Sequence, residues 1–375
     1  MPALLPNIDP DGLLEYSVVF TDRSLNHMSK SFQKIMCDIS RGLKKTYNAQ
    51  KVVIVPGGGT FGMESIARQF ALNKKCLIIR NGWFSYRWSE ILEKGTITDQ
   101  IKIIKAVRSK QNYNAPFSPA PIEQIIDSIN SFQPKVVFAP HVETSAGMLL
   151  PDEYLKQISD AVHNVGGIFV LDCVASGALW VDMQVTGVDV LLSAPQKGWS
   201  SSPCSGLVML SEIANDLIKK TQSNSYVCDL LKWYQIMESY ENGGHAYHTT
   251  MPTDSLAQFR DTLIETEQYG LEKTRQEQID LGNSVRNLLE SRNFESVATK
   301  GFQAPSVIVS YTEDPNIKSG KAFVEQGLQI AAGVPLECDE GENFLTFRIG
   351  LFGLDKLHNL ERTVSNLSTA LDAIV

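Results

Sequence analysis

The stretch GIFVLDCVASGALWVDMQVTGVDVLLSAPQKGW, residues 167–199, contains two apolar runs that each end in polar residues. The runs 167–172 and 188–193 are mostly apolar, apart from Asp189 and the terminal Asp172 and Ser193, and do not alternate regularly, which predicts strands covered on both faces. Asp172 ends the first run, where a carboxylate costs free energy unless a cation or strong donors pair with it. Lys197 follows the second run, and a lysine shielded from water can act as a base or form an imine.

The alternation of strand and helix extends outward from this stretch, from about residue 28 to about residue 210. The apolar runs that predict further strands are 51–55, 76–80, 100–106, 136–140 and 206–210. The segments with helical periodicity are 28–46, 60–72, 86–93, 122–131 and 151–165. Strands that alternate with helices over this length predict an α/β fold with a mostly parallel, doubly wound sheet.

The pattern changes after about residue 254. A long helical segment at 254–291 is interrupted by Gly270 and Gly282, and it is followed by a strand at 305–311. A helix near 319–328, a strand at 343–349 and a helix at 355–374 complete the chain. This mixed pattern predicts a smaller α+β domain. We expect a large domain at 17–255 and a small domain formed by 1–16 and 256–375.

The composition excludes several classes of protein. The 375 residues carry a net charge of −8, which argues against a general nucleic-acid binder and against attraction to an anionic membrane. We see no transmembrane segment and no basic leader. The six cysteines have no metal-ligand spacing, so we expect no metal site and a reduced, cytoplasmic environment.

Three other strand ends also carry polar or aromatic residues. In doubly wound sheets, ligands bind beyond the carboxyl ends of the strands. The segment IVPGGGTFGMES (54–65) predicts a phosphate cradle, NGWFSYR (81–87) offers an aromatic wall, and HVETSAG (141–147) offers hydroxyls and a carboxylate. Each motif also has a structural explanation: a tight turn, core packing, or capping by Thr144 and Ser145.

Together, the five strand ends suit a single ligand. That ligand has a phosphate, a flat ring, a ring nitrogen that needs an anion, and an aldehyde that a lysine can attack. Pyridoxal 5′-phosphate (PLP) has all four features, and its enzymes use a Schiff-base lysine with an acidic partner for the ring nitrogen.

The sequence resembles the class V aminotransferases of PLP-dependent fold type I, and within them the alanine–glyoxylate/serine–pyruvate aminotransferase branch. The similarity extends from about Asn26 to the C-terminus. The matching segments are HMSKSFQKIMCDI, VPGGGTFGMES, NGWFSYR, HVETSAG, LDCVAS, SAPQKGW, AYHTTMP and FRIGLFG. The resemblance implies a fold with a large PLP-binding domain and a smaller C-terminal domain.

The resemblance also implies site residues. Lys197 matches the Schiff-base lysine and Asp172 the partner of the ring nitrogen, while Phe84 and Val174 match the two residues that cover the ring faces. The other implied cofactor contacts are Gly58, Gly59 and Thr60 in the phosphate loop, Thr144 at the ring hydroxyl, Gln196 at the phosphate, and Tyr247 and Thr250 from the partner subunit of a homodimer.

Arg348 matches the arginine that holds the substrate carboxylate, a task that suits a bidentate guanidinium. Arg348 could instead form a structural ion pair, Tyr247 could serve packing alone, and His141 and His245 are expected to be structural. The chain lacks the Gly-Pro-rich N-terminal segment that is usual in the family. This departure leaves the amino donor and acceptor open and directs attention to Asn26 and His27 as candidate substrate contacts.

The function that the resemblance implies is a ping-pong transfer of an amino group from an amino acid to a 2-oxo acid, with glyoxylate or pyruvate as the acceptor. The alternatives are a PLP-dependent lyase, a cysteine-desulfurase-like enzyme, or a non-catalytic binding protein with the same fold. A desulfurase needs a reactive cysteine. Cys338 is placed in a loop, but its acidic neighbours Glu337, Asp339 and Glu340 would raise the pKa of its thiol.

Overall fold

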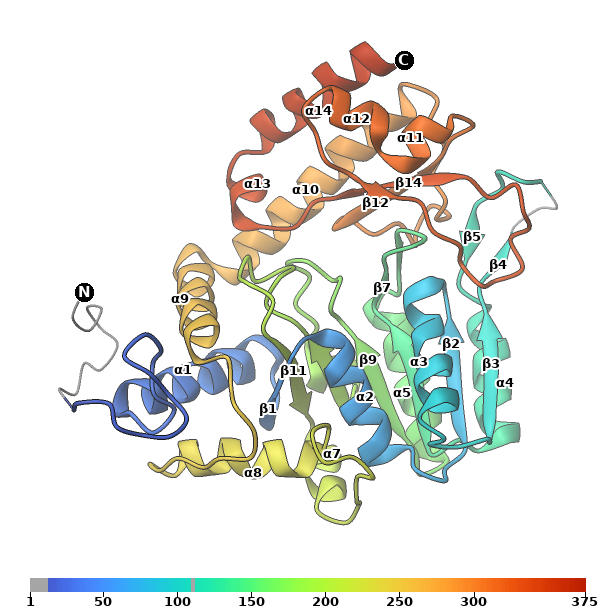
Figure 1. The fold of residues 1–375 in the computed structure, drawn as a ribbon. Helices are drawn as coiled ribbons and strands as arrows, with labels where there is room; N and C mark the ends of the chain where they lie inside the picture. Colours follow the sequence, from blue (N-terminus) through green and yellow to red (C-terminus); the bar gives the residue numbers. More distant parts are fainter. Residues whose placement is uncertain (1–12, 109–111) are drawn as a thin grey trace.

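A seven-stranded sheet, in the order β1-β11-β10-β9-β6-β2-β3, forms the centre of the protein (Figure 1). The computed structural model describes residues 13–108 and 112–375. Six strands run in the same direction, and β11 runs antiparallel between β1 and β10. The strands are β1 Lys51–Pro56, β2 Cys76–Arg80, β3 Ile101–Lys105, β6 Val136–Pro140, β9 Ile168–Asp172, β10 Val190–Ser193 and β11 Ser205–Leu210. This arrangement confirms the predicted α/β fold.

Helices cover both faces of this sheet. In Figure 1, α2 and α3 lie on one face, whereas α4 and α5 lie on the other. The helices of this part are α1 Lys30–Tyr47, α2 Gly59–Phe70, α3 Trp83–Lys94, α4 Ile122–Phe132, α5 Asp152–Asn164, α6 Met183–Thr186, α7 Glu212–Ile218, α8 Leu230–Glu241 and α9 Thr253–Tyr269. The strands β2, β6 and β11 are buried along their whole length, as the continuous apolar runs predict.

A second, smaller sheet lies beyond the end of the large one, at the top of Figure 1. Its order is β12-β14-β13, and both strand pairs are antiparallel. The helices and strands of this second part of the chain are α10 Leu271–Glu290, β12 Val307–Tyr311, α11 Pro315–Ser319, α12 Lys321–Glu325, β13 Ala331–Ala332, β14 Thr346–Gly350, α13 Leu354–His358 and α14 Leu360–Ile374.

Two short strand pairs lie near this junction. They are β4 Val107–Arg108 with β5 Phe117–Ser118, and β7 Val142–Glu143 with β8 Met148–Leu149. A core cluster connects the two parts, because it combines Val142 and Met148 with Val297, Val307 and Leu336.

Three helical segments differ in detail from the sequence prediction. The helix predicted near 319–328 is shorter, at Lys321–Glu325, and Gly320, which has a φ of +82°, separates it from another single-turn helix at Pro315–Ser319. The C-terminal helix is divided at Asn359, and the long segment 254–291 is divided at Gly270, which has a φ of +110°, as predicted, but continues through Gly282. Such positive φ values lie outside the right-handed helical region, so the helices end there.

The predicted domain division between residues 255 and 256 stays a prediction. The division falls inside α9, and three residues of this helix, Leu256, Phe259 and Leu263, pack in the core of the large sheet. Residues 1–12 of the predicted small domain lie outside the described residues. Within the described ranges, no helix is long and apolar enough to cross a membrane.

A candidate active site at the carboxyl ends of the parallel strands

A cavity of about 530 Å³ lies where the carboxyl ends of the large sheet meet the small sheet. It brings together residues from distant parts of the chain, including both strand ends of the stretch 167–199. The predicted site residues that line it are Gly59, Thr60, Phe84, Thr144, Asp172, Val174, Gln196, Lys197 and Arg348.

Asp172 is the last residue of β9, in the middle of the sheet. Its backbone pairs with Leu192 of β10 and Pro140 of β6, so strands on both sides fix its position. The carboxylate accepts a hydrogen bond from the Val174 amide at 2.9 Å. Burial raises the pKa of the Asp172 carboxyl to about 6, although this amide and, more weakly, Arg87 lower it. A cation placed in the cavity beside Asp172 would therefore be bound strongly.

Lys197 lies four residues after β10, in a tightly packed loop. A Cβ atom on the next residue, Gly198, would be 2.1 Å from the Gly177 carbonyl oxygen, so only glycine fits there. The Lys197 ammonium lies 5.0 Å from the centre of the Phe352 ring. Burial lowers the pKa of Lys197, and the positive charges of Arg348 and Arg87 lower it further. The lowered pKa increases the fraction of neutral amine, which is the nucleophilic and basic form.

Helix α2 points its N-terminus toward the cavity. The helix begins at Gly59, Gly58 precedes it, and no described side chain caps it. A Cβ atom on Gly59 would be 2.9 Å from Val174 Cγ2, so glycine allows this turn to pack against the loop after β9. The free N–H groups of the first turn, with the Thr60 hydroxyl, form an arrangement that suits an anion such as a phosphate.

Phe84 is positioned by a buried carboxylate. Glu143 accepts hydrogen bonds from the backbone amides of Phe84 and Ser85 and from the Ser85 hydroxyl, at 3.2, 2.9 and 2.7 Å. It also accepts hydrogen bonds from the amide and the hydroxyl of Ser145. Glu143 thus satisfies the first turn of α3, and it holds the Phe84 ring at the cavity wall.

Arg348 reaches the cavity from β14 of the small sheet. Its Nε donates a hydrogen bond to the Ala332 carbonyl at 2.8 Å, and its guanidinium carbon lies 5.5 Å from the centre of the Phe84 ring. No carboxylate forms an ion pair with Arg348 among the described residues. This positive charge therefore faces the cavity and is free to bind an anion.

Four predicted site residues lie away from the cavity of their own chain. Asn26 donates to Glu15, and His27 is buried with its ring 5.6 Å from that of Tyr247. Tyr247 is 54% exposed, and its hydroxyl lies 3.4 Å from that of Thr250. The contact of His27 with Tyr247 places the two predicted pairs next to one another, and their roles stay predictions.

The sequence analysis did not single out several residues that line the cavity. These are Met63, Arg87, Gln329, Ile330, Phe352 and Lys356, among others. Arg87 had a usable signal, because it follows Phe84 by three residues and therefore lies on the same face of α3. Its guanidinium carbon is 4.6 Å from the centre of the Phe84 ring, and Nη1 is 3.5 Å from the Thr60 hydroxyl.

The family model for class-V aminotransferases matches residues 13–334, which is most of the chain. The chain belongs to the class-V aminotransferases. Alanine–glyoxylate aminotransferase 1 of Saccharomyces cerevisiae is 27% identical over 354 residues, which cover 88% of this chain and 86% of the relative. The small subunit of a soluble hydrogenase from Synechococcus is 23% identical, over 94% of this chain and 87% of the relative.

The crystal structure of an alanine–glyoxylate aminotransferase from Nostoc has the same fold as this class-V aminotransferase. The TM-score is 0.77 at 21% identity, and the match covers 92% of this chain and 88% of the Nostoc chain. The family and the fold confirm the resemblance that the motifs predict. The protein is a PLP-dependent aminotransferase of fold type I.

The residues around the cavity fit PLP by their chemistry. The buried Asp172 carboxylate needs a cation, which the protonated ring nitrogen of PLP provides. The uncapped N–H groups at the start of α2, with the Thr60 hydroxyl, are the donors that its phosphate needs. The described residues include no group of three or more His, Cys, Asp or Glu side chains that could hold a metal ion.

Proposed function

We propose that this aminotransferase moves an amino group from an amino acid to a 2-oxo acid by a ping-pong mechanism, with glyoxylate or pyruvate as the acceptor. The observation that carries the proposal is the convergence of Lys197, Asp172 and Arg348 on one cavity. The yeast relative is named for alanine and glyoxylate, which supports small donors and acceptors.

The proposed roles of the cavity residues follow from their surroundings. When bound, PLP supplies an aldehyde that binds amino groups and a ring that accepts the electron pair left at the substrate α-carbon. Asp172 keeps the ring nitrogen protonated, because an ion pair in this buried position is strongly preferred. Lys197 holds the cofactor and then moves the proton from the α-carbon, since its lowered pKa makes its amine a competent base.

The remaining contacts orient the cofactor and the substrate. Phe84 and Val174 would cover the ring faces, and Thr144 would donate to its hydroxyl. The first turn of α2, with Gly58, Gly59, Thr60 and Gln196, would hold the phosphate. Arg348 would bind the substrate carboxylate in a bidentate pair and so orient the substrate toward Lys197.

We also propose a homodimer in which Tyr247 and Thr250 contact the phosphate in the partner's cavity. Support comes from their exposure and from their position outside the cavity of their own chain. His27 packs 5.6 Å from Tyr247, so Asn26 and His27 would approach the partner's cavity by the same route. A substrate contact by these two residues therefore depends on the same dimer.

The aminotransferase proposal explains Cys338 better than a desulfurase does. Cys338 is 5% exposed, and its thiol donates to the Arg80 carbonyl at 3.3 Å. Burial, with the charge of Glu143, raises the pKa of this thiol to about 12. A nucleophilic role needs the thiolate, which such a pKa suppresses at neutral pH.

Half-reactions with a panel of amino acids test the proposal. The PLP-loaded enzyme is mixed with each amino acid in turn, and the loss of the visible cofactor band is followed together with the oxo acid that is released. We expect a small amino acid such as alanine to give one oxo acid per cofactor, and glyoxylate or pyruvate to restore the band. Release of ammonia or sulfide without an acceptor would show a lyase instead.

A further inference from the structure

The loop at residues 333–345 joins two segments that line the cavity. It leaves β13, whose Ala331 lines the cavity, and it enters β14, which carries Arg348. Ala331 pairs with Arg348 across these strands, and the Ala332 carbonyl accepts from Arg348 Nε. The strand β13 has only two residues, so it contributes few contacts of its own to hold Arg348, and the loop that follows it is the next segment to consider.

A glutamate inside the loop gives it a defined shape. The Glu340 carboxylate accepts hydrogen bonds from the backbone amides of Leu336, Glu337 and Cys338, at 2.6, 3.2 and 2.9 Å. Leu336 and Cys338 are buried in the core cluster that connects the two sheets. The loop is therefore a rigid connector rather than a loose surface segment.

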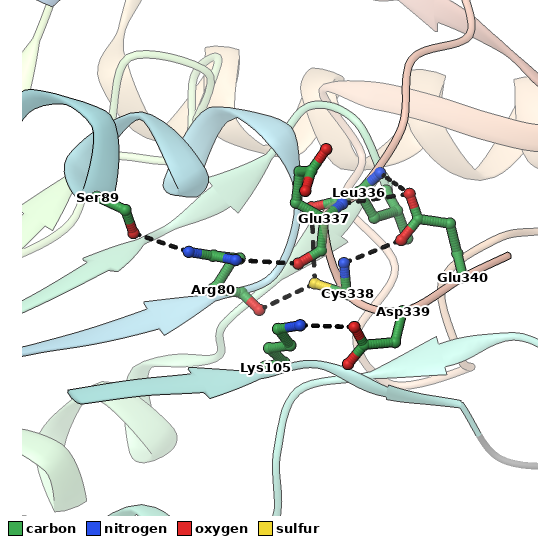
Figure 2. A network of polar contacts seen from close by, with 8 residues as sticks. All are labelled: Arg80, Ser89, Lys105, Leu336, Glu337, Cys338, Asp339 and Glu340. Atoms are coloured by element: carbon green, nitrogen blue, oxygen red, sulfur yellow. Dashed lines mark hydrogen bonds and ion pairs between the residues drawn. The ribbon is translucent and has the colours of Figure 1, made fainter. Parts of the chain in front are cut away.

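Arg80, the last residue of β2, holds this loop against the large sheet. Figure 2 shows its guanidinium between Ser89 on one side and the loop on the other. Nη2 donates to the Ser89 hydroxyl at 2.8 Å, and Nη1 donates to the Glu337 carbonyl at 3.2 Å. The Arg80 carbonyl accepts from the Cys338 thiol at 3.3 Å.

The planar guanidinium suits this position. Its carbon lies 4.6 Å from the centre of the Tyr86 ring on α3, and the residue is 6% exposed. Lysine has a single charged nitrogen, so it could not donate from two fixed directions while it stacks on the ring. A further contact between the loop and the large sheet, the ion pair of Lys105 with Asp339, is largely exposed and contributes little.

Arg80 and Phe84 belong to the same segment at the junction of β2 and α3. Through Arg80, this segment holds the connector next to the large sheet, and the connector holds Arg348 5.5 Å from the Phe84 ring. Arg348 also pairs with Val309 of β12, so the contact of Arg80 with the connector adds a second support, outside the cavity, to the position of Arg348 relative to Phe84.

We propose that Arg80 is a positioning residue for substrate binding: it anchors the 333–345 loop so that Arg348 points at the substrate carboxylate. This inference rests on the proposed role of Arg348. Arg80 does not line the cavity, and through Arg348 it should affect the binding only of substrates that have a carboxylate.

Two oxyamines that differ in a carboxylate test the proposal. Aminooxyacetate and methoxyamine carry the same reactive O–NH₂ group, and only the first carries a carboxylate. Their rates of reaction with the PLP-loaded enzyme give a ratio that reports carboxylate recognition. In R80K, we expect this ratio to fall about tenfold, which is the loss of affinity expected when one charged hydrogen bond is lost. The methoxyamine rate and the visible spectrum should stay the same.

Three further variants distinguish positioning from a general loss of structure. The double variant R80K/R348A should give the same ratio as R348A, because Arg80 acts only through Arg348. E340Q weakens the loop from inside and should lower the ratio in the same direction. K105A, the matched control that removes the exposed ion pair, should leave the ratio unchanged.

Hydrogen exchange provides a readout that does not depend on the cofactor. In R80K, the amides of Leu336 and Cys338 should exchange faster than in the wild type, whereas those of β9 should not change. An unchanged ratio, equal slowing with both oxyamines, additive effects in the double variant, or unchanged exchange would each overturn the inference. If R348A itself left the ratio unchanged, the result would contradict the proposed role of Arg348 in carboxylate binding, rather than the role of Arg80 in positioning it.

Discussion

The floor of the cavity and its roof are held in different ways. The floor, formed by Asp172, Val174, Gln196 and Lys197, follows central strands that pair on both sides. The roof is formed by Arg348 on β14, the middle strand of the three-stranded sheet, by Ala331 on its two-residue edge strand β13, and by Gln329 and Ile330, which precede β13. The groups proposed for the cofactor therefore follow strands inside a seven-stranded sheet, whereas the group proposed for the substrate lies in a small sheet that the 333–345 loop connects to Arg80 of the large one.

Lys197→Ala should have the largest effect and should act on the floor alone. We expect activity to fall by a factor on the order of 10⁴, because the variant loses both the cofactor attachment and the base. Absorbance spectra of the PLP-loaded protein should lack the visible band. Lys356→Ala is the matched control, since this lysine lines the same cavity and should leave the band in place.

Asp172→Asn should weaken binding of the cofactor and stabilise the cofactor-free protein. We expect activity to fall about 10²-fold or more, because the ring nitrogen loses its charged partner. The pKa of Asp172 is raised to about 6, so keeping it ionised in the folded, empty protein costs about 1 to 3 kcal/mol above pH 6. Asparagine removes that cost.

The stability difference between the wild type and this variant should depend on pH, because the cost arises only when Asp172 is ionised. The wild type should lose stability relative to the variant as the pH rises from about 4 to about 6, with a constant difference at higher pH. Thermal unfolding of both cofactor-free proteins across this range measures the difference. A wild type that is the more stable protein at pH 8 would show that Asp172 has another partner.

Arg348→Ala should change the roof and leave the floor intact. We expect the KM for carboxylate substrates to rise about 10- to 100-fold, the usual value of a charged hydrogen-bonded pair. Cofactor titration should give the same affinity and the same visible band as the wild type. If cofactor affinity fell as much as substrate affinity did, the division between floor and roof would be wrong.

Phe84→Ala should have the smallest effect, because stacking of one ring is worth about 0.5 to 1.5 kcal/mol. We expect PLP affinity to fall about 2- to 12-fold, and Phe84→Trp to bind at least as tightly as the wild type. Equilibrium titration of the cofactor measures both. Tighter binding by the alanine variant would contradict a stacking role.

Much of the floor could be predicted because its signals are local. The strand at 76–80 and the strand ends at Asp172 and Lys197 follow from continuous apolar runs that stop at a polar residue. The antiparallel direction of β11 could not be predicted, since strand pairing depends on contacts far apart in sequence. The contact between Arg80 and Glu337 was missed for the same reason, whereas Arg87 had a local signal in its spacing from Phe84 on α3 that the sequence analysis did not use.

The position of β1 at the edge of the large sheet has a consequence for synthesis of the chain. Its neighbour in the sheet is β11, so Lys51 pairs with Leu210, which is 159 residues later (210 − 51). At about 5 to 20 residues per second, a ribosome needs roughly 8 to 30 s to produce that partner. During this interval the apolar run VVIV lacks its partner strand, so this edge of the large sheet forms only after residues 205–210 have been made.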